Sequence, residues 1–193
     1  MCYFPLFINL EGKRVLVVGG GTVAARRICA LLPFGCDIRV VAPEAVEEIR
    51  KLVLAGKVSW SARPYHEGDC QGAFLVLAAT DCGEVNREAC ASGRRAGALV
   101  NRCDRREACD FYFPGLAVDG DLTVGICSGG ADHKKARMVS KAVRAMLSKR
   151  DWRKEEGQNG ASHPSGKPGE RPGGSADEAG DRPIAGAAAG SGV

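Results

Sequence analysis

Hydrophobic and polar positions before residue 102 alternate between short apolar runs and stretches of mixed residues. The apolar runs are continuous, which is typical of strands buried on both faces of a parallel sheet. Between them, apolar residues recur every three or four positions, which predicts amphipathic helices. The predicted strands are 13–18, 37–41, 58–62, 73–79 and 98–101, and the predicted helices are 22–32, 81–95 and a helix that has Pro43 in its first turn. This alternation predicts an α/β fold, a Rossmann-like parallel sheet with helices on both faces.

The pattern changes after residue 110. Residues 111–118 and 122–127 predict two strands joined at Asp119-Gly120-Asp121, and Asp-Gly is a strong signal of a hairpin turn. Residues 131–149 then predict one last helix, whose apolar side is expected to carry Val139, Val143, Met146 and Leu147. A hairpin and a single helix bury too little surface to fold alone. We therefore expect them to pack on the sheet domain or on a second copy of the chain.

Composition changes sharply near residue 151. Residues 157–193 are rich in Gly, Pro, Ser and Ala, and their only large aliphatic residues are Ile184 and Val193. Such a segment cannot bury enough apolar area to offset the entropy of ordering it. A disordered C-terminal tail is therefore predicted over 151–193.

Charge and cysteine content limit the function classes. The net charge of +4 is mild; it does not by itself indicate nucleic acid, although it suits an acidic small molecule. The nine cysteines include no Cys-x-x-Cys pair, and neither a membrane span nor a secretory leader is evident. We interpret them as reduced thiols that serve as small hydrophobic residues in a cytoplasmic protein, and no metal site is predicted.

A glycine string follows the first predicted strand and opens the first predicted helix. It reads Gly19-Gly20-Gly21-Thr22-Val23-Ala24, which fits the pattern Gly-x-Gly-x-x-Gly/Ala of dinucleotide-binding loops. Gly19 permits a tight turn, Gly21 lets the backbone approach a pyrophosphate, and Ala24 lets the helix lie close to the strand. The amides at the helix N-terminus then face the phosphates. The alternating elements around it favour dinucleotide binding over glycines that serve a tight connection alone.

Residues at the ends of two other strands complete the predicted cofactor site. Glu44 lies just beyond the second strand, about twenty residues after the glycines, where an acidic side chain would bind the ribose hydroxyls. No arginine stands at that strand end to hold a 2′-phosphate, which favours NAD over NADP. Thr80 and Asp81 follow the fourth strand and are expected to border the nicotinamide half.

Further motifs lie in a fixed order along residues 3–150. They are Pro5-Leu6-Phe7, the glycine string with Val17-Val18 before it, Val41-Ala42-Pro43, Ala78-Ala79-Thr80-Asp81 with Val85-Asn86, Val100-Asn101 leading to Asp104, Asp110-Phe111-Tyr112-Phe113-Pro114, and Ser128-Gly129-Gly130. The glycine string is common to many dehydrogenases, but the later motifs are much more particular. In these motifs the chain resembles the precorrin-2 dehydrogenases, the oxidase and chelatase module of siroheme synthases.

The resemblance implies an NAD-dependent dehydrogenation of precorrin-2 to sirohydrochlorin in siroheme and tetrapyrrole biosynthesis. It implies a homodimer whose second domain comes from both chains, and some family members also insert ferrous iron. The domains would then be an NAD-binding Rossmann domain over 1–113, a dimerisation and substrate domain over 114–150, and the tail.

The resemblance also implies roles for individual residues. The cofactor would contact Thr22 and Val23 in the glycine loop and Pro43 and Glu44 at the end of the second strand. Asp104 would match the essential carboxylate of the family.

Loss of a hydride from the macrocycle requires a proton to leave as well, and a carboxylate such as Asp104 can accept it as a general base. Removal of pyrrole N–H protons during metal insertion could use the same group. The same motifs suggest Asn101 and Ser128 as substrate-binding residues, with Ser128 and its loop amides binding a substrate carboxylate at the start of the last helix. Basic residues expected to matter for a polycarboxylate are Arg102, Arg105, Arg106, Lys134, Lys135 and Arg137.

Two features depart from the family pattern. Where the family has a small residue followed by Ser-Pro, this chain has Ala131-Asp132-His133; Asp132 can cap a helix, but its charge opposes an anionic substrate. The tail stands where many relatives carry a helical domain. Two alternative functions therefore remain open, a bifunctional dehydrogenase and ferrochelatase with Fe²⁺ as second substrate, and a module that senses NAD without turnover.

Overall fold

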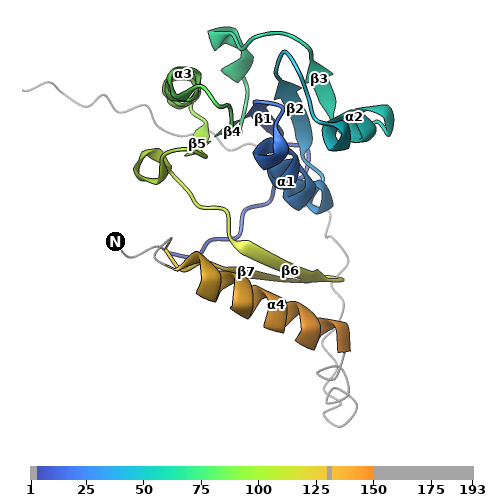
Figure 1. Cartoon of the computed structure of the whole chain (residues 1–193). Coiled ribbons are helices and arrows are strands. Elements are labelled where there is room, and N and C mark those ends of the chain that lie inside the picture. The colour runs from blue at the N-terminus through green and yellow to red at the C-terminus, as the bar shows by residue number, and fades with distance from the viewer. Residues whose placement is uncertain (1–3, 130–131, 150–193) are drawn as a thin grey trace, which may run out of the picture. The chain divides into compact units, whose positions relative to one another are not determined.

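The five apolar runs form one parallel sheet (Figure 1). The computed structural model describes residues 4–129 and 132–149. The strands are β1 (Arg14–Val18), β2 (Asp37–Val41), β3 (Ser59–Ser61), β4 (Leu75–Ala78) and β5 (Leu99–Arg102). They lie in the order β3-β2-β1-β4-β5, so the chain reverses direction across the sheet between β1 and β4. In such sheets a crevice for ligands opens at the carboxyl ends of the strands beside this reversal.

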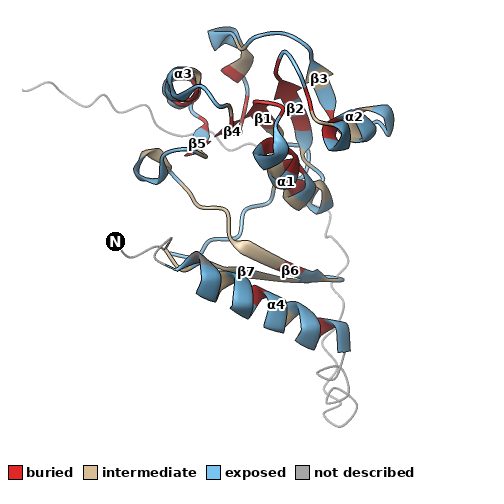
Figure 2. Cartoon of the chain, viewed as in Figure 1, coloured by how far each residue is buried: buried red, intermediate tan, exposed pale blue. Residues whose placement is uncertain are grey.

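Helices cover both faces of the sheet, which confirms the predicted Rossmann-like fold class. The α1 helix (Thr22–Leu31) and the α2 helix (Glu47–Leu54) pack on one face through Ala24, Ile28 and Ile49. The α3 helix (Gly83–Arg95) packs on the other through Ala89 and Cys90. The central strands β1 and β4 are buried from end to end except for Arg14, because both of their faces are covered (Figure 2). Their continuous Val and Leu runs follow from this burial.

The second helix begins later than predicted. Pro43 was expected in its first turn, but α2 begins at Glu47 with Val46 as its N-cap. The intervening residues form a turn against the glycine loop, where the Val46 N–H donates to the Gly20 carbonyl at 2.9 Å. Because this bond holds Val46 in the turn, the helix begins only after it. A contact between residues so far apart leaves no mark on the local sequence pattern.

The connection from β3 to β4 contains only a short 3-10 helix, Glu67–Cys70. Arg63 pairs with Asp69 through two hydrogen bonds, and the Asp69 carboxylate also accepts from the His66 N–H at 2.8 Å. These bonds fold the segment back against the sheet. Its residues Pro64 and Tyr65 thereby reach the carboxyl edge of the sheet.

The predicted hairpin and last helix are also present. The strands β6 (Gly115–Asp119) and β7 (Leu122–Ile126) pair antiparallel, and Gly120 adopts a left-handed φ of 61° in the turn. The α4 helix (His133–Lys149) lies on this hairpin, so close that a side chain at Gly115 would collide with Ser140.

Two residues predicted on the buried side of α4 are solvent-exposed instead. Leu147 is buried, but Val139 is 37% exposed and Met146 is 55% exposed. The apolar residues of α4 lie on two sides of the helix. The two-stranded hairpin covers the side that carries Leu147 and leaves the side that carries Val139 and Met146 exposed. The prediction of a single apolar side was therefore wrong for Val139 and Met146.

No helix in the described part of the chain combines the length and apolarity needed to cross a membrane. The tail predicted over 151–193 lies outside the described residues.

Candidate nucleotide-binding and catalytic site

The loop between β1 and α1 requires glycine at its first position for two reasons. Gly19 has a φ of 117°, which L side chains rarely adopt. A Cβ at this position would also collide with the Ala79 carbonyl at the end of β4. The Gly19 N–H donates to the Val41 carbonyl at 2.9 Å, which ties the loop to β2. The loop is therefore held between the two strands that flank β1.

The middle glycine is required by a different neighbour. A Cβ on Gly20 would collide with the Glu44 carbonyl, because the turn after β2 packs directly on this loop. The dinucleotide pattern leaves this position free, so the sequence analysis gave Gly20 no role. Only the tertiary contact with the Glu44 backbone shows that this position requires glycine.

The third glycine faces open space. A Cβ on Gly21 would meet no protein atom within 4 Å. Gly21 is the N-cap of α1; it offers no capping side chain, and the first turn of the helix contains no acidic residue. The start of α1 thus has unfilled room and a positive dipole end, which suits a phosphate group. These features fit the pyrophosphate of a dinucleotide.

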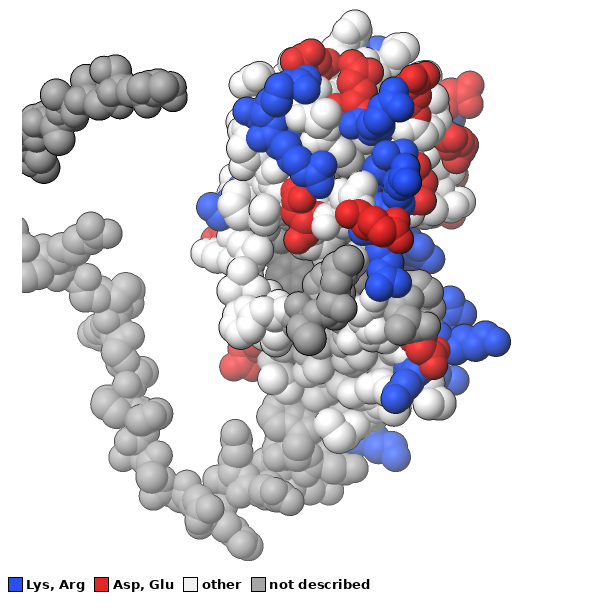
Figure 3. Space-filling view, turned by 90° about the vertical axis from the view of Figure 1, so that its left-hand side faces the viewer, with Lys and Arg blue, Asp and Glu red and all other residues white. Residues whose placement is uncertain are grey.

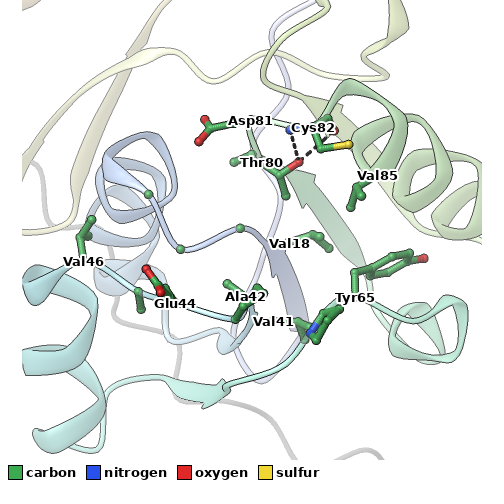
Figure 4. Close-up of a pocket in the computed structure, with 17 residues that line it drawn as sticks. Val18, Val41, Ala42, Glu44, Val46, Tyr65, Thr80, Asp81, Cys82 and Val85 are labelled. Carbon is green, nitrogen blue, oxygen red and sulfur yellow. Dashed lines mark hydrogen bonds between the residues drawn. The ribbon is translucent and has the colours of Figure 1, made fainter.

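A cleft of about 620 Å³ opens beside the glycine loop (Figure 4). It runs along the carboxyl ends of β1, β2 and β4. The predicted cofactor residues that line it are Gly19, Gly21, Pro43, Glu44 and Thr80. The other predicted site residues, which are Thr22, Val23, Asn101, Asp104 and Ser128, are not among its lining residues. Thr22 and Val23 are exposed in the first turn of α1, next to the cleft.

The wall of the cleft opposite Glu44 is largely apolar. Tyr65 lies there with Val41 and Val85 (Figure 4). The Tyr65 hydroxyl is 3.3 Å from the Cys70 Sγ, and burial raises the pKa of Tyr65 well above its usual value. The partly buried Tyr65 ring therefore forms part of this apolar wall. No pattern in the sequence indicates this residue, because the segment that carries it has no regular period.

A buried asparagine organises the loop between β4 and α3. Asn86 is fully buried, and its Oδ1 accepts from the Thr80 hydroxyl at 2.7 Å and from the Thr80 N–H at 3.0 Å. Its Nδ2 donates to the Thr80 carbonyl at 2.9 Å. Thr80, at the edge of the cleft, is thereby fixed in place. A polar residue on the buried side of a predicted helix was the available signal for this role.

Asp104 lies beyond the end of β5, against the start of α3. Both of its carboxylate oxygens accept hydrogen bonds from Arg102, each at 2.9 Å. This pairing holds the pKa of Asp104 below its usual range, and the nearby Asn86 amide acts in the same direction. Asn86 thus fixes Thr80 and also lies close to Asp104. The carboxylate lies one side chain away from the lining of the cleft.

The segment after Asp104 is anchored at several points. The Asp110 carboxylate accepts from the Val100 N–H at 2.9 Å and from Arg94 at 2.8 Å. The buried Asn101 donates its Nδ2 to the Phe111 carbonyl at 2.8 Å. Asn101 thus supports the backbone in this structure, and the substrate contact predicted for it remains a prediction.

Ser128 is half-buried in the loop between β7 and α4. Gly130, the last residue of the predicted loop motif, and Ala131, the predicted first residue of the last helix, lie outside the described residues. Asp132 caps the helix as expected, since its Oδ1 accepts from the Lys135 N–H at 2.8 Å. The substrate-carboxylate role of Ser128 stays a prediction.

Comparison with known proteins finds a family model and similar proteins. A family model described as "Putative NAD(P)-binding" matches residues 6–115. The "Probable multifunctional siroheme biosynthesis protein HemA" of Ruminiclostridium josui is 38% identical over 142 residues, which cover 73% of this chain and 28% of that protein. The siroheme synthase of Mannheimia succiniciproducens is 35% identical over 147 residues, which cover 76% of this chain and 31% of that protein. The chain thus spans less than a third of the length of these two relatives.

A solved structure is similar over most of its length. The protein described as "SirC, precorrin-2 dehydrogenase" aligns with a TM-score of 0.67 at 25% identity. The alignment covers 83% of each chain. The likeness therefore extends beyond the parallel sheet, since residues 6–115 alone make up a smaller share of the chain.

Proposed function

This chain belongs to the NAD(P)-binding family whose model it matches, and on that premise we propose that it oxidises precorrin-2 to sirohydrochlorin with NAD in siroheme biosynthesis. One observation carries the proposal: the open start of α1 and the Asp104 carboxylate lie at the same edge of the sheet, linked through Thr80 and Asn86. A site for a dinucleotide and a group that can accept a proton are thus neighbours.

The residues of the cleft fit a dinucleotide. The space beside Gly21 and the helix start would hold the pyrophosphate, Glu44 the ribose hydroxyls, and the Thr80 end the nicotinamide. When bound, NAD supplies the acceptor for the hydride that leaves the substrate.

The surroundings of Glu44 favour NAD over NADP. A carboxylate at this position repels a 2′-phosphate, and a cation would be needed to offset it. Arg50 donates to the Ala45 carbonyl at 2.8 Å and lies over the Trp60 ring, while Arg63 is paired with Asp69. Arg50, beside the lining residue Ala45, and Arg63, beside the lining residue Pro64, thus already have partners. We therefore propose NAD as the cofactor.

Asp104 is proposed as the general base. The Asp104 carboxylate is ionised at neutral pH, as an ordinary Asp is, and Arg102 lowers its pKa further, so it is free to accept a proton. The same pairing makes Asp104 a weaker base, so its value lies in position more than in proton affinity. The site therefore supplies a proton acceptor that is held in one position and is ionised before the proton arrives.

The substrate is proposed to be the polycarboxylate precorrin-2, and α4 suits such a partner. The helix carries six Lys and Arg residues and no Asp or Glu, and all six are exposed. They include the predicted Lys134, Lys135 and Arg137. By contrast, acidic and basic side chains are interspersed over the upper part of the face drawn in Figure 3. The basic helix is therefore the better surface for an anionic macrocycle.

We further propose a cytoplasmic homodimer. Exposed large apolar residues occur in the N-terminal segment, on the hairpin and on α4, among them Phe4, Phe7, Val118 and Met138. Large exposed apolar surface favours association. The eight cysteines in the described residues are free thiols, which suits a reducing compartment.

Anaerobic assay of the purified chain with precorrin-2 tests the proposed function. The wild type is expected to form NADH, with NAD preferred to NADP, and Asp104→Ala is expected to lower kcat by about 10²-fold or more, the usual contribution of a general base. Asp37→Ala, in an exposed ion pair at the opposite end of the sheet, is the matched control and should keep wild-type activity.

The assay also separates the alternatives. Binding of NAD with no NADH formed would contradict the enzyme and favour a sensing module. Insertion of Fe²⁺ into added sirohydrochlorin, lowered in Asp104→Ala, would extend the function to a ferrochelatase.

A further inference from the structure

Arg102 was expected to bind a carboxylate of the substrate, but the structure gives its guanidinium other partners. Its Nε and Nη2 both donate to Asp104 at 2.9 Å, and its Nη2 also donates to the Gly83 carbonyl at 2.9 Å. The Arg102 side chain is only 11% exposed, whereas that of Asp104 is 37% exposed. The arginine thus lies beneath the carboxylate and leaves it open to solvent.

This geometry fixes the carboxylate in two directions. A bidentate arginine holds a carboxylate in one plane, which a lysine cannot do. The bond to Gly83 anchors the same arginine to the first residue of α3. Asp104, although it stands in a loop, is therefore tied to both β5 and α3.

Three thiols also lie near the pair, and Arg94, Arg26 and Arg27 lie near those thiols. Cys90 on α3 and Cys103 and Cys109 in the neighbouring segment interact with Asp104, with Arg102 or with both. Burial raises the pKa of all three, to about 11 for Cys90. They are neutral near pH 7, so they neither replace Arg102 nor compete with Asp104.

We propose that Arg102 is a positioning residue, which holds the Asp104 carboxylate at the end of β5 in the orientation where it accepts the substrate proton. The inference rests on the proposed function of Asp104 as general base. It predicts that Arg102 acts through Asp104 and not through contact with the substrate.

A double-mutant cycle under anaerobic conditions with precorrin-2 and NAD tests this inference. Arg102→Met is expected to lower kcat by about tenfold, while the KM for precorrin-2 and the Kd for NAD change by less than about twofold. In the Asp104→Ala background the same substitution should change kcat by less than about twofold, because the group that it positions is gone. Arg102→Lys, which keeps the charge, should recover part of kcat.

Arg39→Met is the matched control. Like Arg102, Arg39 pairs with an aspartate two residues away in the chain. This aspartate is Asp37, and the pair lies at the amino end of β2, away from the cleft. Its loss should leave kcat and KM unchanged. A rise in KM with kcat intact in Arg102→Met would show a substrate contact instead, and full additivity in the cycle would show independent roles; either result would overturn the inference.

A second measurement separates this inference from the proposed function. The carboxyl carbon of Asp104, followed by NMR as pH is varied in the cofactor-free protein, should titrate at higher pH in Arg102→Met than in wild type. An unchanged titration would overturn the inference even in an active enzyme. If Asp104 titrates at higher pH in Arg102→Met than in wild type, but the wild type forms no NADH, then the role of Arg102 toward Asp104 is supported and the proposed function is wrong.

Discussion

Gly19, Gly20 and Gly21 are adjacent in sequence, yet each is glycine for a different reason. Gly19 is needed for its backbone conformation and its approach to β4, and Gly20 for its contact with the turn after β2. Gly21 alone borders empty space. At the residue scale, Gly19 and Gly20 therefore contribute to the stability of the fold, whereas Gly21 is the glycine that leaves room for a ligand.

Alanine substitutions should separate these two roles. Gly20→Ala forces a Cβ into the Glu44 backbone and should lower the free energy of unfolding by about 3 kcal/mol or more. Gly21→Ala should cost about 1 kcal/mol or less of stability, the usual difference at an N-cap. It should nevertheless weaken NAD binding by about tenfold, because its methyl group enters the phosphate space.

Urea unfolding and titration with NAD measure both quantities. Equal stabilities for the two variants would contradict the assignment of Gly20. Unchanged NAD affinity in Gly21→Ala would mean that the phosphates lie elsewhere.

At the scale of elements, the segment from β3 to β4 shapes the cleft without being a regular helix. Asp69 organises it through Arg63 and the His66 N–H, and it thereby presents Tyr65 to the cleft. The bond from Arg63, chiefly, lowers the pKa of Asp69. The conformation of this segment thus depends on the ionised carboxylate of Asp69.

The pH dependence of stability should report this carboxylate. A lowered pKa in the folded state means that the stabilisation is present above the ordinary pKa of about 3.9 and is lost as pH falls through the lowered value. Wild type should therefore lose stability below about pH 4, and Asp69→Asn should lose less over the same range while being less stable at pH 7. Urea unfolding at pH 7 and pH 3 measures this; an identical acid loss in both proteins would contradict the role of Asp69.

At the scale of the whole molecule, the central strands β1 and β4 are buried, whereas the hairpin and α4 leave several large apolar side chains exposed. Met138 is 66% exposed and Met146 is 55% exposed on α4, and Val118 on β6 is 45% exposed. These residues lie on elements separate from the cleft. Their exposure is the physical basis for expecting a second copy of the chain.

Charge placed on this surface should weaken the proposed dimer. The double substitution Met138→Glu and Met146→Glu is expected to shift the protein toward monomer in size-exclusion chromatography with light scattering, because burial of the carboxylates is unfavourable. Leu54→Glu is the matched control, since Leu54 is 87% exposed on α2 of the sheet domain. A monomeric wild type, or a dimer that tolerates both glutamates, would contradict this interface.

Local patterns in the sequence determined the strands, most of the helices, the hairpin turn and the phosphate loop. Each depends on a period or on a short motif, and the physical causes, burial on both faces or a φ that only glycine adopts readily, act within a few residues. Tertiary structure alone decided that Gly20 must be glycine, that Asn86 fixes Thr80 close to Asp104, and that Arg102 is committed to Asp104. These facts depend on which side chains meet across the sheet edge, and contacts between distant segments leave no period in the chain.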